Sequence, residues 1–217
     1  MSSTGTSATD TKPNRMDRRR QRTRQQLMTA TIELILKKGV DETATDEITD
    51  AADVGRRTFY NHFENKKDCI KAAIGERFSR YAAESFLIAE KHEDQAVALT
   101  VSAMAVFTQV SADPVTAQLV KYPRLLIEAV RESQREFIMH TTLKGLEQQR
   151  FSTAIPPETL DALISWGFVG LVLENITQPS NTDRSTVWAH FILQNLGIPQ
   201  DEIEPIINAA RGISSQA

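Results

Sequence analysis

The sequence has few of the residues that build covalent or metal cross-links. It holds a single cysteine, Cys69, among 217 residues, which excludes an intrachain disulfide framework and a cysteine-cluster metal site. The four histidines have no ligand spacing among themselves, so we expect no metal ion and no cofactor. Glycine-rich phosphate loops, nucleophile elbows and paired-histidine motifs are missing, so we expect no catalytic residues and no enzyme.

Long apolar runs are also missing. No run approaches the roughly 20 residues that span a bilayer. The N-terminal segment MSSTGTSATDTKPNR lacks the apolar core of a secretory signal. We therefore expect a cytoplasmic protein with no membrane partner.

Charge is distributed unevenly along a chain whose net charge is −3. Residues 1–75 carry 14 basic and 11 acidic residues, a balance of +3, whereas residues 76–217 carry 11 and 17, a balance of −6. Residues 12–24, KPNRMDRRRQRTR, set seven basic residues against one acidic residue. A basic end on an acidic body indicates an anionic partner for the N-terminal third.

Apolar residues recur at three- and four-residue steps, and the alternation typical of strands is absent, so the sequence predicts an all-α fold. Residues 1–14 lack apolar periodicity and are expected to be disordered. Prolines fall mostly near the starts or ends of the predicted helices. These helices cover about 18–38, 45–52, 56–63, 65–90, 94–110, 114–121, 123–149, 157–176, 182–196 and 200–211.

Residues 43–63 have the pattern of a helix-turn-helix. Thr43 or Thr45 offers a hydroxyl cap for a short helix, and Asp53-Val54-Gly55 forms a tight corner. A third helix follows from Arg56. Such a helix can enter the major groove of DNA, which is about 12 Å wide.

Residues 24–70, RQQLMTATIELILKKGVDETATDEITDAADVGRRTFYNHFENKKDCI, resemble the N-terminal domain of the TetR family of transcriptional regulators. The resemblance covers about a quarter of the chain. It implies a three-helix DNA-binding domain over residues 15–64, with the helix-turn-helix at about 45–64. It also implies that residues 65–217 bind an effector and form a homodimer.

The resemblance assigns DNA contacts residue by residue. Tyr60 matches a phosphate-binding tyrosine, and Lys66 matches a lysine that meets the DNA backbone. Arg56 and Arg57 depart from the family's usual residues, and from guanidinium chemistry we expect Arg56 or Arg57 to read guanine in the major groove, or one of them merely to hold phosphate. A basic arm reaches the neighbouring minor groove. The full expected set is Arg20, Arg22, Arg24, Thr45, Arg56, Arg57, Thr58, Tyr60, Asn61, His62 and Lys66.

Residues 162–173, ALISWGFVGLVL, are uncharged on every side, so this helix is expected to be buried on opposite faces. With the helix near 182–196 it resembles the family's dimer interface; the alternative is an ordinary core helix. The expected interface residues are Gly167, Gly170, Val187, Trp188 and Phe191.

Aromatic, flexible apolar and isolated charged residues are the candidates for an effector pocket, although such residues also fill cores. They are Phe78, Tyr81, Met104, Phe107, Tyr122, Arg124, Glu128, Phe137 and Trp166. The expected function is that of a homodimeric repressor, released from an inverted repeat in double-stranded DNA by a small, mostly apolar effector. The alternative is a regulator of the same fold that answers to no small ligand or activates.

Overall fold

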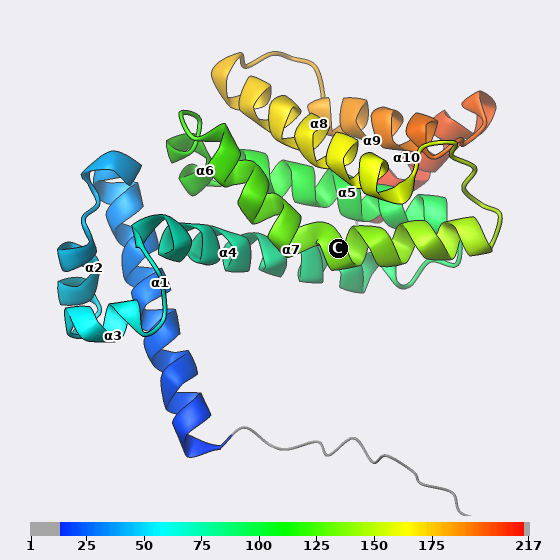
Figure 1. The fold of residues 1–217 in the computed structure, drawn as a ribbon. Helices are drawn as coiled ribbons and strands as arrows, with labels where there is room; N and C mark the ends of the chain where they lie inside the picture. Colours follow the sequence, from blue (N-terminus) through cyan, green and yellow to red (C-terminus); the bar gives the residue numbers. More distant parts are fainter. Residues whose placement is uncertain (1–13, 215–217) are drawn as a thin grey trace, which may run out of the picture.

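The computed structural model describes residues 14–214, except for the side chains of Gln134, Glu136, Phe137 and Ser214. Within this range every regular element is an α-helix (Figure 1). The N-terminal elements are α1 (Arg15–Glu42), α2 (Thr45–Ala51), α3 (Arg56–Tyr60) and α4 (Lys66–Ala89). The others are α5 (Gln95–Ala112), α6 (Pro114–Gln118), α7 (Pro123–Glu147), α8 (Pro157–Thr177), α9 (Arg184–Asn195) and α10 (Gln200–Ser214). The all-α prediction is confirmed, and the predicted helices match those observed to within a few residues.

The start of α1 is fixed by a reciprocal cap. The side chain of Asn14 accepts hydrogen bonds from the backbone N–H groups of Met16 at 2.7 Å and Asp17 at 3.0 Å. The Asp17 carboxylate accepts one from the Asn14 N–H at 3.2 Å. Two N–H groups that the helix leaves unbonded are thereby satisfied, so the helix begins earlier than its apolar pattern indicates.

Near its other end α1 is broken at Gly39, whose φ of 87° is a conformation that glycine adopts without strain. The chain then turns into α2, where the expected threonine cap is wrong. Thr43 is fully buried and its hydroxyl donates to the Gly39 carbonyl at 2.7 Å, so it stabilises the end of α1 instead. Ala44 precedes α2, and its N–H donates to the Glu47 carboxylate at 3.0 Å.

Two apolar cores share α1 and α4. The smaller one joins Leu27 of α1, Ile48 of α2, Phe59 of α3 and Cys69 of α4. The larger core contains Ile35 and Val40 from α1 and Ile70, Ile74 and Phe78 from α4, with residues of α5 to α10. Both helices therefore run from the small domain into the large one, which Figure 1 shows as α1 to α3 beside a larger helical body.

In the large domain α5 packs against α4, α6, α7, α8, α9 and α10. Two helices, α5 and α8, are long and apolar enough to cross a membrane by length and composition, with 61% and 39% of their most apolar windows buried. The core helix of a water-soluble protein has the same properties, and α5 holds that place here. Burial in the core does not account for the apolar residues on the outer surface of α8.

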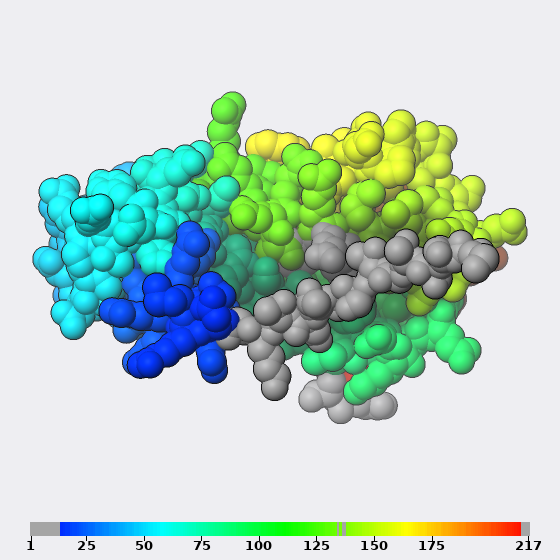
Figure 2. Space-filling model, turned by 60° about the horizontal axis from the view of Figure 1, so that its bottom comes forward, coloured from blue at the N-terminus to red at the C-terminus, as the bar shows by residue number. Residues whose placement is uncertain are grey.

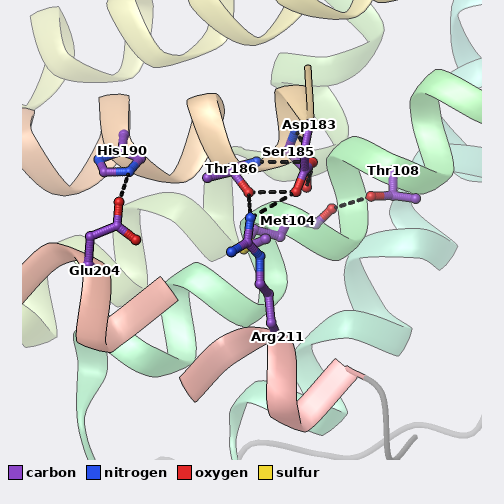
Figure 3. A network of polar contacts seen from close by, with 8 residues as sticks. All are labelled: Met104, Thr108, Asp183, Ser185, Thr186, His190, Glu204 and Arg211. Atoms are coloured by element: carbon purple, nitrogen blue, oxygen red, sulfur yellow. Dashed lines mark hydrogen bonds and ion pairs between the residues drawn. The ribbon is translucent and has the colours of Figure 1, made fainter. Parts of the chain in front are cut away.

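Polar contacts join α9 to α10 (Figure 3). Asp183 accepts from the backbone N–H of Ser185 at 3.1 Å and from Arg211 Nη2 of α10 at 3.1 Å. Burial acts to raise the pKa of Asp183, but hydrogen bonds from Ser185, Thr186 and Arg211 outweigh it and lower the pKa. With the His190–Glu204 contact at 3.0 Å, this network fixes α10 against α9.

Candidate nucleic-acid interface and ligand cavity

The short helix α3 is anchored by its apolar face. Phe59 is fully buried and Phe63, just beyond the helix, is nearly so, with their ring centroids 5.7 Å apart. Since side chains four residues apart lie on one face, this pair turns Arg56, Arg57 and Tyr60 outward. Tyr60 is 54% exposed, a large exposure for an aromatic side chain that also contacts Phe59 edge to face. The outer face of α3 is therefore free to meet a partner.

The two arginines of α3 have different surroundings. Arg56 Nε lies 2.7 Å from Asp46 Oδ1 on α2, and both side chains are exposed. Arg57 is exposed, and no ion pair holds it within residues 14–214. An exposed ion pair is worth about 0–1 kcal/mol, so Arg56 is restrained weakly while Arg57 is free to turn toward a base.

Lys66 links the start of α4 to the end of α1. Its Nζ donates to the Val40 carbonyl at 3.2 Å, and an ammonium has two further donors. Asn65 caps α4 by accepting from the Asp68 N–H at 3.0 Å. This corner holds a positive charge in a fixed position beside α3.

The expected arginine arm is wrong in form, because Arg20, Arg22 and Arg24 lie in the helix α1. The minor groove of DNA is about 6 Å wide, too narrow for a helix of about 10–12 Å. Arg24 also has an intramolecular role: Nη1 donates to the His62 carbonyl at 3.3 Å and the guanidinium lies 4.3 Å from the centroid of Phe63. Arg20 and Arg22 remain exposed.

A hollow between α1 and the end of α3 is lined by Asp17, Arg20, Gln21, Arg24 and His62. Burial lowers the pKa of His62, and the charges of Arg20 and Arg24 lower it further. The lowered pKa favours the neutral imidazole, so the positive charge of this surface comes mainly from arginine. Figure 2 shows the start of α1 (blue) next to α3 and the start of α4 (cyan) at one end of the molecule.

Three other expected DNA contacts occupy places of intermediate or full exposure. Thr45 is the first residue of α2 and is half-buried, and Thr58 is half-buried within α3. Asn61 is exposed at the end of α3. All three lie on the same end of the chain's fold as Arg57 and Tyr60.

A cavity of about 50 Å³ lies between α5, α7, α8 and α9 in the large domain. Its walls are mostly apolar and include two serines and a threonine. The lining residues are Leu99, Ser102, Ala103, Val106, Val130, Ile138, Thr142, Ile164, Ser165, Phe168, Trp188 and Ile192.

The structure places the expected pocket residues elsewhere. Phe78, Met104 and Phe107 are buried in the core, and Tyr81 donates to Asp113 Oδ2 at 2.7 Å. Tyr122 is half-buried, while Arg124, Glu128 and Trp166 are exposed on the surface. The side chain of Phe137 lies outside the described part of the chain. Aromatic and charged character alone does not reveal which face of a helix meets a cavity.

The two tryptophans lie opposite to expectation: Trp188 was expected at the dimer interface and Trp166 in the pocket. Trp188 is buried and lines the cavity, whereas Trp166 is 51% exposed on the outer face of α8. Of the other expected interface residues, Gly170 and Val187 are exposed and Gly167 and Phe191 are half-buried. Leu163 is also exposed, so the outer surface of α8 and α9 is strongly apolar.

Ser102 and Ser165 line the cavity but are not among the residues expected from the sequence. Each is an isolated polar residue on a helix whose neighbours are apolar, in VSAMAVF and LISWGF. Their isolation among apolar neighbours on a core-facing stripe is the sequence feature that could have identified them. Among the described residues no group of three or more His, Cys, Asp or Glu is arranged to hold a metal ion.

Residues 27–73 match the family model for bacterial regulatory proteins of the tetR family. The HTH-type transcriptional regulator TcmR of Streptomyces glaucescens is 36% identical over 69 residues, which are 32% of this chain. The matched segment spans 30% of the length of TcmR.

Solved structures resemble the whole fold. RolR in complex with its ligand resorcinol has a TM-score of 0.74 at 20% identity, over 88% of this chain and 95% of that one. FadR from Bacillus subtilis in complex with stearoyl-CoA has a TM-score of 0.58 at 13% identity, over 81% and 99%. At these identities the likeness shows the fold.

Proposed function

By its N-terminal helix-turn-helix domain the chain belongs to the TetR family of bacterial regulatory proteins, and from this premise we propose that it is a homodimeric transcriptional repressor. It acts in the cytoplasm on an inverted-repeat operator and leaves that operator when a small, mostly apolar effector binds. The observation that carries the proposal is the outer face of α3, where Arg57 and Tyr60 project beside basic groups of α1 and α4.

In this proposal the contacts divide into two kinds. Arg57 reads a guanine by bidentate hydrogen bonds, because its guanidinium is exposed and outside any described ion pair. Tyr60, Lys66, Arg20 and Arg22 hold phosphate, which positions the domain without reading sequence. Thr45, Thr58, Asn61 and His62 flank these contacts.

The proposed dimer uses the outer surface of α8 and α9. Leu163, Trp166 and Val187 are large apolar side chains exposed there, and Gly170 leaves open space around its backbone. A contiguous apolar surface of this kind marks a protein–protein interface. Two copies would then present two α3 helices to successive major grooves, about 34–36 Å apart or a multiple of that.

The cavity between α5, α7, α8 and α9 is the proposed effector site. Relatives of the same fold are described with ligands as different as resorcinol and stearoyl-CoA, so the fold does not choose the ligand. The helix α4 packs against α5 and α7, which line the cavity, and it also carries Lys66. An effector that favours one position of α4 changes the spacing of the two α3 helices, and by linkage DNA weakens effector binding equally.

Selection and sequencing of bound DNA fragments tests the proposal. We expect an inverted repeat, bound with an affinity that falls as salt is raised because phosphate contacts release counterions. Enrichment of no sequence, or of unpaired half-sites only, would contradict the dimeric repressor. Release of the labelled fragment by a compound that raises the protein's melting temperature tests the effector; a regulator that answers to no ligand would keep its DNA.

A further inference from the structure

Two serine hydroxyls in the cavity have no hydrogen-bond partner. Ser102 of α5 and Ser165 of α8 are 1% and 2% exposed, and neither Oγ has a partner among the described protein atoms. Both residues line the cavity. Buried hydroxyls are nearly always bonded in folded proteins. Of the buried hydroxyls without a partner among the described residues, these two line the cavity, where a bound molecule could supply the missing bonds.

A helical hydroxyl can usually satisfy itself by bonding to the carbonyl four residues earlier. In α5, Thr100 donates to the Ala96 carbonyl at 2.7 Å and Thr108 donates to the Met104 carbonyl at 2.9 Å. Ser102 lies between these threonines on the same helix and makes no such bond. Its hydroxyl is therefore available to a group inside the cavity.

The walls favour a flat, uncharged molecule. Phe168 and Trp188 both line the cavity, with ring centroids 5.5 Å apart in an edge-to-face arrangement, and aromatic faces and edges attract a further ring. No charged side chain lines the cavity among the described residues, so an ionised ligand would lose its hydration without gaining a counter-charge.

A buried carboxylate lies on the same face of α8. Asp161, one turn before Ser165, accepts from Arg131 Nη2 at 2.8 Å through Oδ2, while its buried Oδ1 has no partner. Because Arg131 balances the charge of Asp161, the unbonded Oδ1 acts only as an acceptor and favours a ligand that carries a hydrogen-bond donor.

The free volume is small. A cavity of about 50 Å³ has room for the equivalent of a few water molecules. It is smaller than the roughly 150 Å³ apolar cavity that binds benzene, so a single ring with short substituents fits only if the lining side chains move apart, and a long acyl chain does not fit.

We propose that the effector is an uncharged, single-ring aromatic alcohol whose hydroxyl groups bond to Ser102 and Ser165. This inference rests on the proposed function, because only a regulator has an effector. Binding of the molecule to the cavity can nevertheless be measured without DNA. It identifies the ligand by the two unbonded hydroxyls, the aromatic wall and the absence of a lining charge.

The test is calorimetric titration of the full-length protein, without DNA, with phenol, a benzenediol, toluene and benzoate. We expect the benzenediol to bind at least about fivefold more tightly than toluene, because a neutral hydrogen bond contributes roughly 0.5–1.5 kcal/mol, or about two- to tenfold, for each hydroxyl. Phenol should fall between them, and benzoate should bind no better than toluene.

Three alanine variants locate the effect. Ser102→Ala and Ser165→Ala should each reduce the preference for the benzenediol over toluene by about two- to tenfold. Ser85→Ala is the matched control, since Ser85 is equally buried with an unbonded Oγ but lies on α4 outside the cavity lining. It should leave the preference unchanged. Ala103→Leu, which fills the cavity, should abolish binding of all probes while the protein stays folded.

Equal binding of toluene and the benzenediol would overturn the inference. So would tight binding of benzoate, an unchanged preference in both serine variants, or the failure of every probe to bind at millimolar concentration. These outcomes are separate from the repressor proposal, which is judged by DNA selection. A benzenediol that binds through the serines but leaves the operator complex intact would contradict the repressor mechanism alone.

Discussion

Arg56 and Arg57 are adjacent in sequence, but among the described residues only Arg56 of the two pairs with a carboxylate, that of Asp46. We expect Arg57→Ala to weaken operator binding by about 1–3 kcal/mol and to relax the preference at one base position. Arg56→Ala should cost less and leave the preference unchanged. Fluorescence anisotropy with the operator and with single-base variants measures both effects. The assignment is reversed if Arg56→Ala alone relaxes the sequence preference.

Cys69 is fully buried against Thr31, with 3.2 Å between Sγ and Oγ1. Burial raises the pKa of its thiol to about 11, although the contact with Thr31 acts in the opposite direction. Because the thiolate is the reactive form, iodoacetamide at pH 8 should not label the folded protein and should label it in urea. Labelling of both at the same rate, followed by mass spectrometry, would show that the thiol is accessible.

The raised pKa of the Cys69 thiol also makes the stability of the folded protein depend on pH. The folded protein keeps the thiol protonated up to pH of about 11, while the unfolded chain loses this proton above its usual pKa of 9.0. The protonated thiol therefore contributes its full stabilisation of the folded protein below pH 9, and this stabilisation declines as the pH rises toward 11.

At the scale of elements, Asp113, the residue that follows α5, joins the end of that helix to α4 and α6. Its side chain is fully buried, pairs with Arg77 of α4 and accepts from Tyr81. It also caps α6 by accepting from the Val115 N–H at 2.9 Å. Burial raises the pKa of Tyr81, and its bond to Asp113 raises it further.

Asp113→Asn should lower the free energy of unfolding by about 3 kcal/mol, because it removes one member of a largely buried ion pair. Asp94→Asn is a matched control: Asp94 also caps a helix, α5, and pairs with an arginine, Arg150, but is 41% exposed. It should cost about 1 kcal/mol. Urea denaturation of both variants measures the difference. Equal losses in the free energy of unfolding would contradict the larger contribution assigned to Asp113.

The helices could be predicted from sequence because their ends carry local signals, such as Asn65 before α4 and the prolines that begin α6, α7 and α8. The outer face of α3 could be predicted for the same reason, since Phe59 and Phe63 fix which side is buried. The cavity could not. In α8 both faces are apolar, so periodicity does not say that Ser165 faces inward and Trp166 outward. That assignment depends on how α8 packs against α5 and α9, which is a property of tertiary structure.

At the scale of the whole molecule, the proposed dimer can be tested without disturbing the protomer. A side chain at Gly170 would meet nothing within 4 Å, so Gly170→Glu should fold normally and carry a charge into the apolar interface. We expect monomers in sedimentation velocity and loss of operator binding. Gly212→Glu on α10, which also has open space, is the control and should remain dimeric. A dimeric Gly170→Glu variant would remove this surface of α8 from the interface.

The shared cores of α1 and α4 restrict how the small domain can move. It is connected to the large domain through α4 and again where α1 packs against α6. A rigid body attached at one point can tilt in every direction, whereas one attached at two points keeps only a rotation about the line that joins them. The distance between the two α3 helices of a dimer then depends on a single angle. Ligands of different shape would all rotate the small domain about the same line. They would differ only in the size of that rotation.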